Sequence, residues 1–238
     1  MSDQAYALEV PFWESTVGQS RFMSYTSELE RELILEASTL AVPPSVALDI
    51  GCEGGRYSQI LAERGWSMIC ADVNERALEL CQRRIPGARC VLLTNDNHEL
   101  PCSDGSLGIL LCIECPVMPA EWFAREAMRT LRTGGVLVGV FFNRLSWRGA
   151  LTHTRARIMG FPDYYSHSYP SWRRAMRVQG FEMVREVGCR WPPFPLTSNS
   201  RFLSFALAAE SAIGLQKVTS LSPVVNFIAK KKVPSASS

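Results

Sequence analysis

The chain has 238 residues, of which 47% are apolar and 20% are charged, and its formal net charge is +2. This length and composition are typical of a globular protein with a substantial core. The small net charge, without a dense stripe of Lys and Arg, excludes a surface built for polyanions, so we expect no nucleic-acid partner.

The ends and the cysteines indicate a cytoplasmic protein. The N-terminus, MSDQAYALEVPFWES, shows no basic start followed by an apolar run, and no segment approaches the roughly 18 consecutive apolar residues of a membrane span. The eight cysteines form no disulfide-like framework, so we expect reduced thiols. Cys112 and Cys115 form a CxxC, but no second pair of ligands has matching spacing, and we expect no metal.

In chain order, the first predicted elements are a helix and two strand–helix units. Residues 1–45 indicate an N-terminal helical cap, in which Glu28–Leu40 is the clearest helix. VALDI then predicts a strand followed by a helix over 57–64, and WSMICAD predicts a strand followed by a helix over 75–84, with Asn74 as its N-cap.

The following segments continue the alternation. RCVLLTND and GILLCIE predict the third and fourth strands, a helix follows over about 120–131, and GGVLVGVFF predicts the fifth strand. Strands that alternate with helices of this length form βαβ units and a parallel sheet, and runs that are apolar on both faces indicate a sheet covered on both sides.

The pattern changes after Phe142. Residues 143–171 are rich in aromatics, Arg and His, with weak periodicity, and a helix follows over 172–179. FEMVREVGCRW predicts a sixth strand, PPFPLTSNS a loop, 202–215 a helix and PVVNFIAKK a closing strand. We therefore expect one domain over 1–238, divided into a cap (1–45), a core (46–142), an insertion or lid with the sixth strand (143–217), and the last strand with its tail (218–238).

The stretch LDIGCEGGRYS lies where doubly wound sheets bind their ligands, between the first strand and the first helix. Gly51 matches the first glycine of the dinucleotide fingerprint, but Glu53 occupies the second position, where it would repel a pyrophosphate. Glu53 also restricts the backbone to negative φ unless strain is accepted. With Asp49 and Glu53 on the loop, we expect a ligand with a cationic end, such as S-adenosylmethionine (AdoMet), which carries an ammonium and a sulfonium.

Acids at the ends of the next two strands extend this prediction. Asp72 ends the second strand about twenty residues beyond the loop, where an acid binds ribose hydroxyls. Asp96 ends the third strand, where its carboxylate would accept from the adenine amino group beside the backbone of Asn97. The predicted cofactor-binding residues are Asp49, Gly51, Glu53, Gly55, Asp72, Val73, Asp96, Asn97 and Cys112.

Four segments, LDIGCEGGRYS, ADVNERALELC, NDNHELPCSDGS and EAMRTLRTGGVLV, resemble the ordered motifs of class I AdoMet-dependent methyltransferases, most closely the small-molecule branch with the ubiquinone/menaquinone-type enzymes. The resemblance covers about 46–142. It implies a Rossmann-like methyltransferase fold: a doubly wound, mostly parallel, seven-stranded sheet with an antiparallel last strand. The chain departs from the family at Glu53, at Leu107 and Gly108, where that branch commonly has Phe-Asp, and at Met118, where many members carry a histidine.

The resemblance implies methyl transfer to a small, partly hydrophobic acceptor. The chain has ECPVM where amino-group methyltransferases commonly carry an Asn/Asp-Pro-Pro-aromatic motif, so we expect O- or C-methylation. The candidate catalytic residues are His153, His167 and Glu114, as general bases or polar groups of the crevice. Alternatives are a non-catalytic protein with the AdoMet fold, and, less favoured by the broken glycine pattern, an NAD-dependent oxidoreductase. The sequence carries no signal for an oligomeric state.

Residues 143–170 and 191–217 are predicted to form the acceptor lid over the ends of strands four and five, because pockets for small molecules are mostly apolar and aromatic. The plainer alternative is that their aromatics close the core at the edge of the sheet. Those aromatics are Trp147, Phe161, Tyr164, Tyr165, Tyr169, Trp191, Phe194, Phe202 and Phe205.

Overall fold

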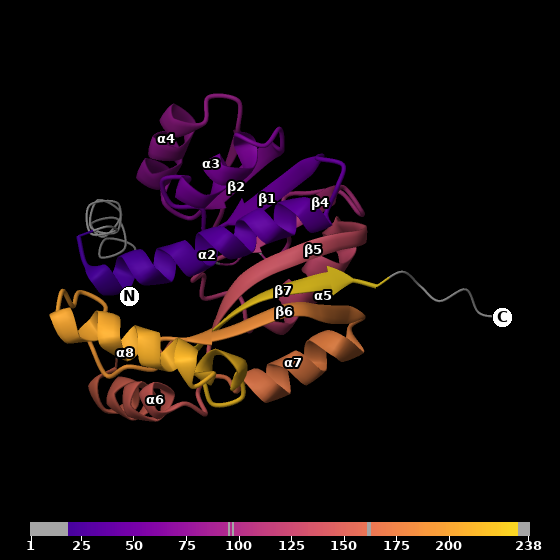
Figure 1. The fold of residues 1–238 in the computed structure, drawn as a ribbon. Coiled ribbons are helices and arrows are strands. Elements are labelled where there is room, and N and C mark those ends of the chain that lie inside the picture. Colours follow the sequence, from indigo (N-terminus) through magenta and orange to yellow (C-terminus); the bar gives the residue numbers. More distant parts are fainter. Residues whose placement is uncertain (1–18, 95, 97, 161–162, 233–238) are drawn as a thin grey trace.

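The structure, a computed structural model, describes residues 19–94, 96, 98–160 and 163–232. Its centre is a seven-stranded sheet with the strand order β3-β2-β1-β4-β5-β7-β6 (Figure 1). β1 pairs in parallel with both β2 and β4, whereas β7 runs antiparallel to β5 and β6. The doubly wound, mostly parallel sheet with an antiparallel last strand is therefore confirmed. The strands are β1 Val46–Ile50, β2 Ser67–Asp72, β3 Arg89–Leu92, β4 Leu107–Cys112, β5 Leu131–Phe142, β6 Phe181–Cys189 and β7 Val224–Lys231.

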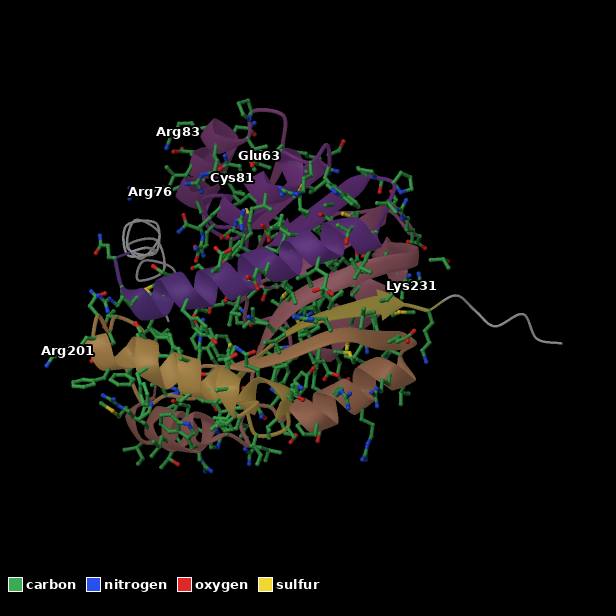
Figure 2. The ribbon with its side chains drawn as sticks, in the orientation of Figure 1. Glu63, Arg76, Cys81, Arg83, Arg201 and Lys231 are labelled. Carbon is green, nitrogen blue, oxygen red and sulfur yellow. The ribbon has the colours of Figure 1, made fainter. Side chains whose placement is uncertain are left out.

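Helices cover both faces of the sheet, and side chains fill the space between the layers (Figure 2). One face packs against apolar residues of α2, α3 and α4, and the other against residues of α5 and α7. None of the helices in the described ranges is both long and apolar enough to cross a membrane. The helices are α2 Arg21–Leu40, α3 Arg56–Ala62, α4 Glu75–Arg84, α5 Glu121–Thr130, α6 Trp147–Met159, α7 Tyr169–Val178, α8 Arg201–Ala212 and the 3₁₀ turn η1 Leu215–Lys217.

Local signals explain where several elements begin. The Asn74 side chain accepts from the backbone N–H groups of Arg76 and Ala77, so it caps α4 as predicted. Ser20 caps α2 in the same way through Met23, and this helix begins well before the predicted Glu28. All six residues of β4 are buried, as the covered face on each side of a parallel strand requires.

The main difference from the predicted elements is α6, within the segment that showed weak periodicity. Only Gly149 and Ala156 of this helix are buried, whereas Leu151, Ile158 and Met159 are exposed. A helix that packs through two small residues leaves no apolar stripe of period 3.6, and so it has little sequence signal. The third strand is also shorter than predicted, because its pairing with β2 ends at Leu92.

Candidate cofactor and acceptor site

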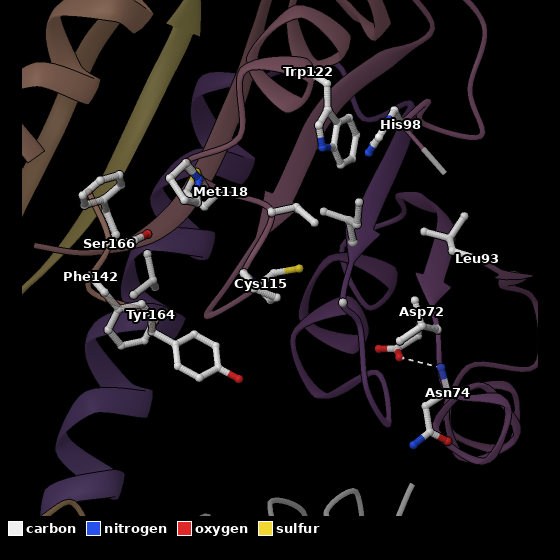
Figure 3. Close-up of a pocket in the computed structure, with 18 of the residues that line it drawn as sticks. Asp72, Asn74, Leu93, His98, Cys115, Met118, Trp122, Phe142, Tyr164 and Ser166 are labelled. Atoms are coloured by element: carbon white, nitrogen blue, oxygen red, sulfur yellow. Dashed lines mark hydrogen bonds between the residues drawn. The ribbon is translucent and has the colours of Figure 1, made fainter. Parts of the chain in front are cut away.

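A cavity of about 840 Å³ lies beyond the carboxyl ends of β1, β2, β4 and β5 (Figure 3). One end is bordered by Gly51, by Asp72 at the end of β2 and by Asn74 in the turn that follows. The other end is apolar and aromatic, and it also carries a few polar groups. Its position matches the switch point between β1 and β4, where open α/β sheets bind ligands.

The loop after β1 is fixed to the end of β2 by three backbone donors. The N–H groups of Gly51 and Cys52 donate to the carbonyl oxygen of Ala71 at 2.8 and 3.3 Å, and the N–H of Glu53 donates to Asp72 Oδ2 at 2.9 Å. A Cβ atom at Gly51 would lie 2.9 Å from Cys115 Sγ, so a larger residue does not fit there without a shift. These contacts hold the loop close to the cavity.

The loop adopts left-handed backbone conformations, including one at a residue that is not glycine. Gly51 and Gly55 have φ values of 72° and 77°, and Glu53 has 46°. Glu53 therefore does not have the negative φ expected of an unstrained residue, and the backbone is strained at this position. Gly55 begins α3, where its φ again suits glycine.

Asp72 connects the loop to the cavity. Its Oδ2 accepts from Glu53 N–H and its Oδ1 from Asn74 N–H, each at 2.9 Å, and the residue is 3% exposed. Burial raises the pKa of the Asp72 carboxyl. Asn74 Nδ2 is buried without a hydrogen-bond partner in the described structure, and Asn74 borders the cavity. A carboxyl with further lone pairs beside an unpaired amide donor fits a ligand with vicinal hydroxyls, such as the ribose of AdoMet.

Other predicted cofactor residues lie in different surroundings. Asp49 is 3% exposed and accepts from Ser58 Oγ at 2.6 Å, and burial raises its pKa to about 8. Cys112 is fully buried within β4. Among the described residues, the cavity lining contains neither of them, nor Glu53 and Gly55.

The region after β3 was predicted to hold the adenine. Asp96 is exposed and does not line the cavity, and Asn97 lies outside the described residues. Leu93, Thr94 and His98 of the same region do line it. Sequence reasoning missed Leu93 and Thr94, although a strand end followed by a turn was the signal that singled out Asp96. Val73, in contrast, borders the cavity as predicted.

The acceptor end of the cavity combines aromatic and polar side chains. The aromatic and apolar surfaces come from Met118, Trp122, Phe142 and Tyr164, and the ring of His98 lies 5.5 Å from that of Trp122. The polar groups are Asp163, Ser166 and His167. Ser166 Oγ lies 2.6 Å from His167 Nδ1.

Asp163 is the polar residue that sequence reasoning missed. His153, which was predicted as a base, does not line the cavity as described, but its Nδ1 lies 2.6 Å from Asp163 Oδ2. Asp163 Oδ1 accepts from Tyr165 N–H at 2.9 Å. Each carboxylate oxygen of Asp163 therefore has a hydrogen-bond partner of its own. This pairing depends on α6, which the sequence did not reveal, so no local signal identified it.

Glu114, the third predicted catalytic residue, forms an ion pair with Arg190. Arg190 is 5% exposed and also lies 3.7 Å from Glu30 on α2. Two carboxyls thus share one buried guanidinium, and burial together with the charge of Glu114 raises the pKa of Glu30 to about 8. The Tyr57 hydroxyl donates to Glu30 as well. Through Arg190 and Glu30, Glu114 belongs to a polar network that connects α2, α3 and the end of β6. Among the described residues, the cavity lining does not include Glu114.

The predicted lid aromatics have several different roles. Tyr164 lines the cavity, and Tyr165 packs edge-on against Phe142. Tyr169 is 1% exposed and packs against Phe141 and Trp172, so it closes the core, as the plainer alternative proposed. Phe202 and Phe205 on α8 are exposed, and no described residue of 191–217 lines the cavity. Phe161 lies outside the described residues.

Comparisons with known proteins agree with this geometry. Residues 47–135 match a family described as "Methyltransferase domain". The chain is 26% identical over 192 residues to a malonyl-[acyl-carrier protein] O-methyltransferase of Methylococcus capsulatus. This match covers 74% of the chain and 66% of that protein. The chain is 31% identical over 109 residues to a 2-methyl-6-phytyl-1,4-hydroquinone methyltransferase of Synechocystis. This match covers 43% of the chain and 33% of that protein.

A solved structure extends the likeness beyond the core. The geranyl diphosphate C-methyltransferase of Streptomyces coelicolor, solved with Mg²⁺, geranyl diphosphate and S-adenosyl-L-homocysteine, has a TM-score of 0.62 and 15% identity, with 88% of this chain and 80% of that chain covered. This likeness concerns the fold. Together with the strand order and the loop after β1, the comparisons support a class I AdoMet-dependent methyltransferase, with the family match over residues 47–135 of the chain. The chain spans about two thirds of the length of one of the two relatives and one third of the other.

Proposed function

We propose that the protein transfers a methyl group from AdoMet to a small, partly apolar acceptor, on oxygen or carbon. The observation that carries the proposal is the continuity of the cavity. A hydroxyl-binding end with Asp72 and Asn74 opens into an aromatic end with Trp122 and Phe142. A donor and an acceptor bound in such a cavity would lie next to each other, which is the main requirement for an in-line displacement.

The chain's residues would hold AdoMet through the end of β2 and the loop after β1. The Asp72 carboxyl and the unpaired Asn74 amide supply an acceptor and a donor for the ribose hydroxyls. Gly51 borders the cavity and is proposed to lie against the cofactor's amino-acid end, and Glu53 is proposed to lie near its ammonium. When bound, AdoMet supplies an electrophilic methyl group on its sulfonium.

At the acceptor end, Asp163 is the proposed general base for an oxygen or carbon acid. Its carboxylate borders the cavity, and Tyr165 N–H and His153 fix its two oxygens. His153 is accordingly proposed to position Asp163, and His167, which borders the cavity itself, is a second candidate base. The aromatic walls exclude water from the reacting groups.

The relatives support the acceptor class. One is named as an O-methyltransferase of a malonyl group on acyl-carrier protein, and the other as a methyltransferase of a prenylated hydroquinone. Each name describes an acceptor group that is small or partly apolar. An oxygen or carbon acceptor in the aromatic end of the cavity is the corresponding proposal for this chain.

Two measurements on the purified protein test the proposal separately. Calorimetry with AdoMet and its demethylated product S-adenosylhomocysteine measures binding, with NAD⁺ as the control ligand. Labelled AdoMet incubated with a small-molecule extract, followed by mass spectrometry, measures transfer. We expect binding of both AdoMet-type ligands and a labelled product of low molecular mass. Binding without any product would favour the non-catalytic alternative, and binding of NAD⁺ alone would favour an oxidoreductase.

A further inference from the structure

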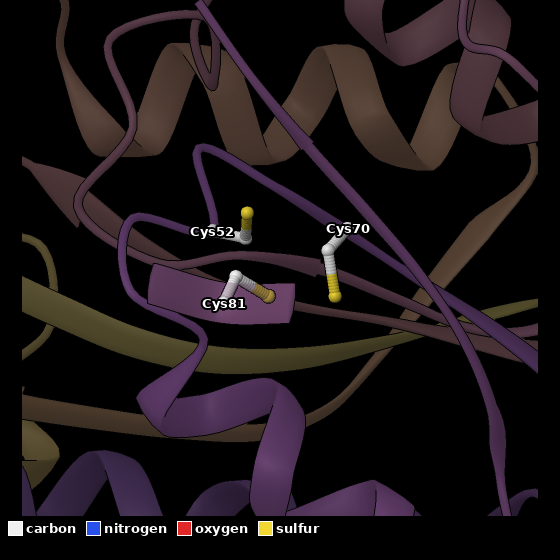
Figure 4. A group of neighbouring side chains, drawn as sticks. All are labelled: Cys52, Cys70 and Cys81. Carbon is white, nitrogen blue, oxygen red and sulfur yellow. The ribbon is translucent and has the colours of Figure 1, made fainter. Parts of the chain in front are cut away.

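Three buried cysteines meet behind the loop that follows β1. Cys52 belongs to this loop, Cys70 to β2 and Cys81 to α4, and their Sγ atoms all lie within 4.8 Å of one another (Figure 4). Cys70 and Cys81 are 0% exposed and Cys52 is 6% exposed. The cavity lining includes Gly51 but none of these cysteines, so the group is separate from the proposed cofactor and acceptor site.

The spacing of the sulfur atoms suits a metal ion at their centre. A metal–sulfur bond of about 2.3 Å in a trigonal arrangement places the three sulfurs about 4 Å apart. Sulfurs that already lie within 4.8 Å of one another reach this separation by small side-chain rotations. The three ligands come from three different elements, so an ion would connect the loop to β2 and α4.

The number and type of ligands limit the choice of ion. In the described part of the chain, no fourth His, Cys, Asp or Glu lies within 4.8 Å of all three sulfurs; Cys90 interacts with Cys81 but is not part of the group. Structural zinc sites are almost always four-coordinate, and three buried sulfurs leave no exposed position for water as a fourth ligand. Soft thiolates select Cu(I), and a three-coordinate sulfur site suits this ion.

Hydrogen bonds from neighbouring residues surround the three sulfurs. Ser58 connects Asp49 to Cys70. Its hydroxyl lies 3.3 Å from Cys70 Sγ and donates to the Asp49 carboxyl. Arg84 on α4 donates to the Gly54 carbonyl, which connects the loop after β1 to α4.

We propose that Cys52, Cys70 and Cys81 form a binding site for one Cu(I) ion, coordinated by three thiolate sulfurs. The ion replaces the thiol protons, which are released on binding. By joining three elements it fixes the loop after β1 to β2 and α4. The site does not depend on methyl transfer.

The test is an anaerobic titration of the reduced full-length protein with Cu(I), in competition with a chromophoric Cu(I) chelator. We expect one tightly held ion per chain and a first coordination shell of three sulfurs by X-ray absorption. Cys52→Ala and Cys81→Ala should each lower the affinity at least about 100-fold, more than the 10–100-fold typical of losing an outer-shell partner. Cys102→Ala, in a half-buried cysteine outside the group, is the matched control and should keep the wild-type affinity.

The outcomes separate a metal site from three thiols that only fill the core. Absence of tight Cu(I) binding to the reduced wild type overturns the proposal, as does wild-type affinity in a folded Cys52→Ala variant. A stoichiometric preference for Zn²⁺ over Cu(I) overturns the assignment of the ion. Circular dichroism checks folding. If Cys81→Ala does not fold, Cys52→Ala decides, because its position on a loop leaves the sheet and helices intact.

Discussion

Replacing Glu53 by glycine tests whether the loop after β1 stores backbone strain. Glu53 has a φ of 46°, in the left-handed region that costs a residue with a side chain roughly 1–2 kcal/mol. Glycine removes this cost but loses about 0.5–1 kcal/mol through the greater entropy of the unfolded chain. We therefore expect Glu53→Gly to be about 0.5–1 kcal/mol more stable than Glu53→Ala, which keeps the strain and removes the same carboxylate.

Urea unfolding with a shared slope measures this difference, and thermal melting gives an independent value. For a chain of this length, a change of about 0.5–1 kcal/mol corresponds to a rise in melting temperature of roughly 1–4 °C. The comparison with Glu53→Ala is needed because the glutamate side chain has contacts of its own. Equal stability of the glycine and alanine variants, or a less stable glycine variant, would refute the strain argument.

The same position tests the charge argument. If the Glu53 carboxylate lies beside the ammonium end of AdoMet, Glu53→Gly should bind AdoMet well, whereas Glu53→Lys should bind it more weakly through charge repulsion. Calorimetry on both variants checks this. Equal affinities would show that the carboxylate takes no part in binding.

Three further predictions concern single carboxyl groups. Asp72→Ala should weaken S-adenosylhomocysteine binding by roughly 1–3 kcal/mol. It should also lower the stability of the protein, because the buried N–H groups of Glu53 and Asn74 lose their acceptor. An unchanged affinity by calorimetry would place the ribose acceptor elsewhere. Asp163→Asn should lower turnover by about 10²–10⁴-fold with intact S-adenosylhomocysteine affinity, and His153→Ala should lower it less; full turnover in the Asp163 variant would remove it as the base. The pKa of Asp49 is about 8 in the folded state, against 3.8 ordinarily, so between these values the folded protein keeps a proton that the unfolded chain releases. Raising the pH from about 4 to 8 therefore lowers the free energy of unfolding progressively. The stability of Asp49→Asn relative to the wild type, from urea unfolding, should therefore be greater at pH 8 than at pH 5, and an equal difference at both would contradict the pKa shift.

The pattern of apolar residues along the chain was sufficient to predict the architecture of the sheet. Continuous apolar runs such as GILLCIE predicted buried parallel strands, because only a strand covered on both faces is apolar on both faces. Asn74 was recognisable as a helix cap because its role depends on the next three residues only. The four ordered motifs indicated a methyltransferase resemblance for a similar reason, since each is a short continuous segment of the chain.

Features that depend on contacts between distant segments required the tertiary structure. The loop that carries the left-handed Glu53 is held by Ala71 and Asp72 of β2, so the sequence around Glu53 could not reveal the strain. Asp163 became a candidate base only through α6, whose two small buried residues leave almost no periodic signal. Cys52, Cys70 and Cys81 lie far apart in the sequence, and the CxxC that the sequence does contain is not part of their group. Short-range periodicity therefore determined the elements and their order, whereas the packing of elements from different parts of the chain decided which side chains share a site.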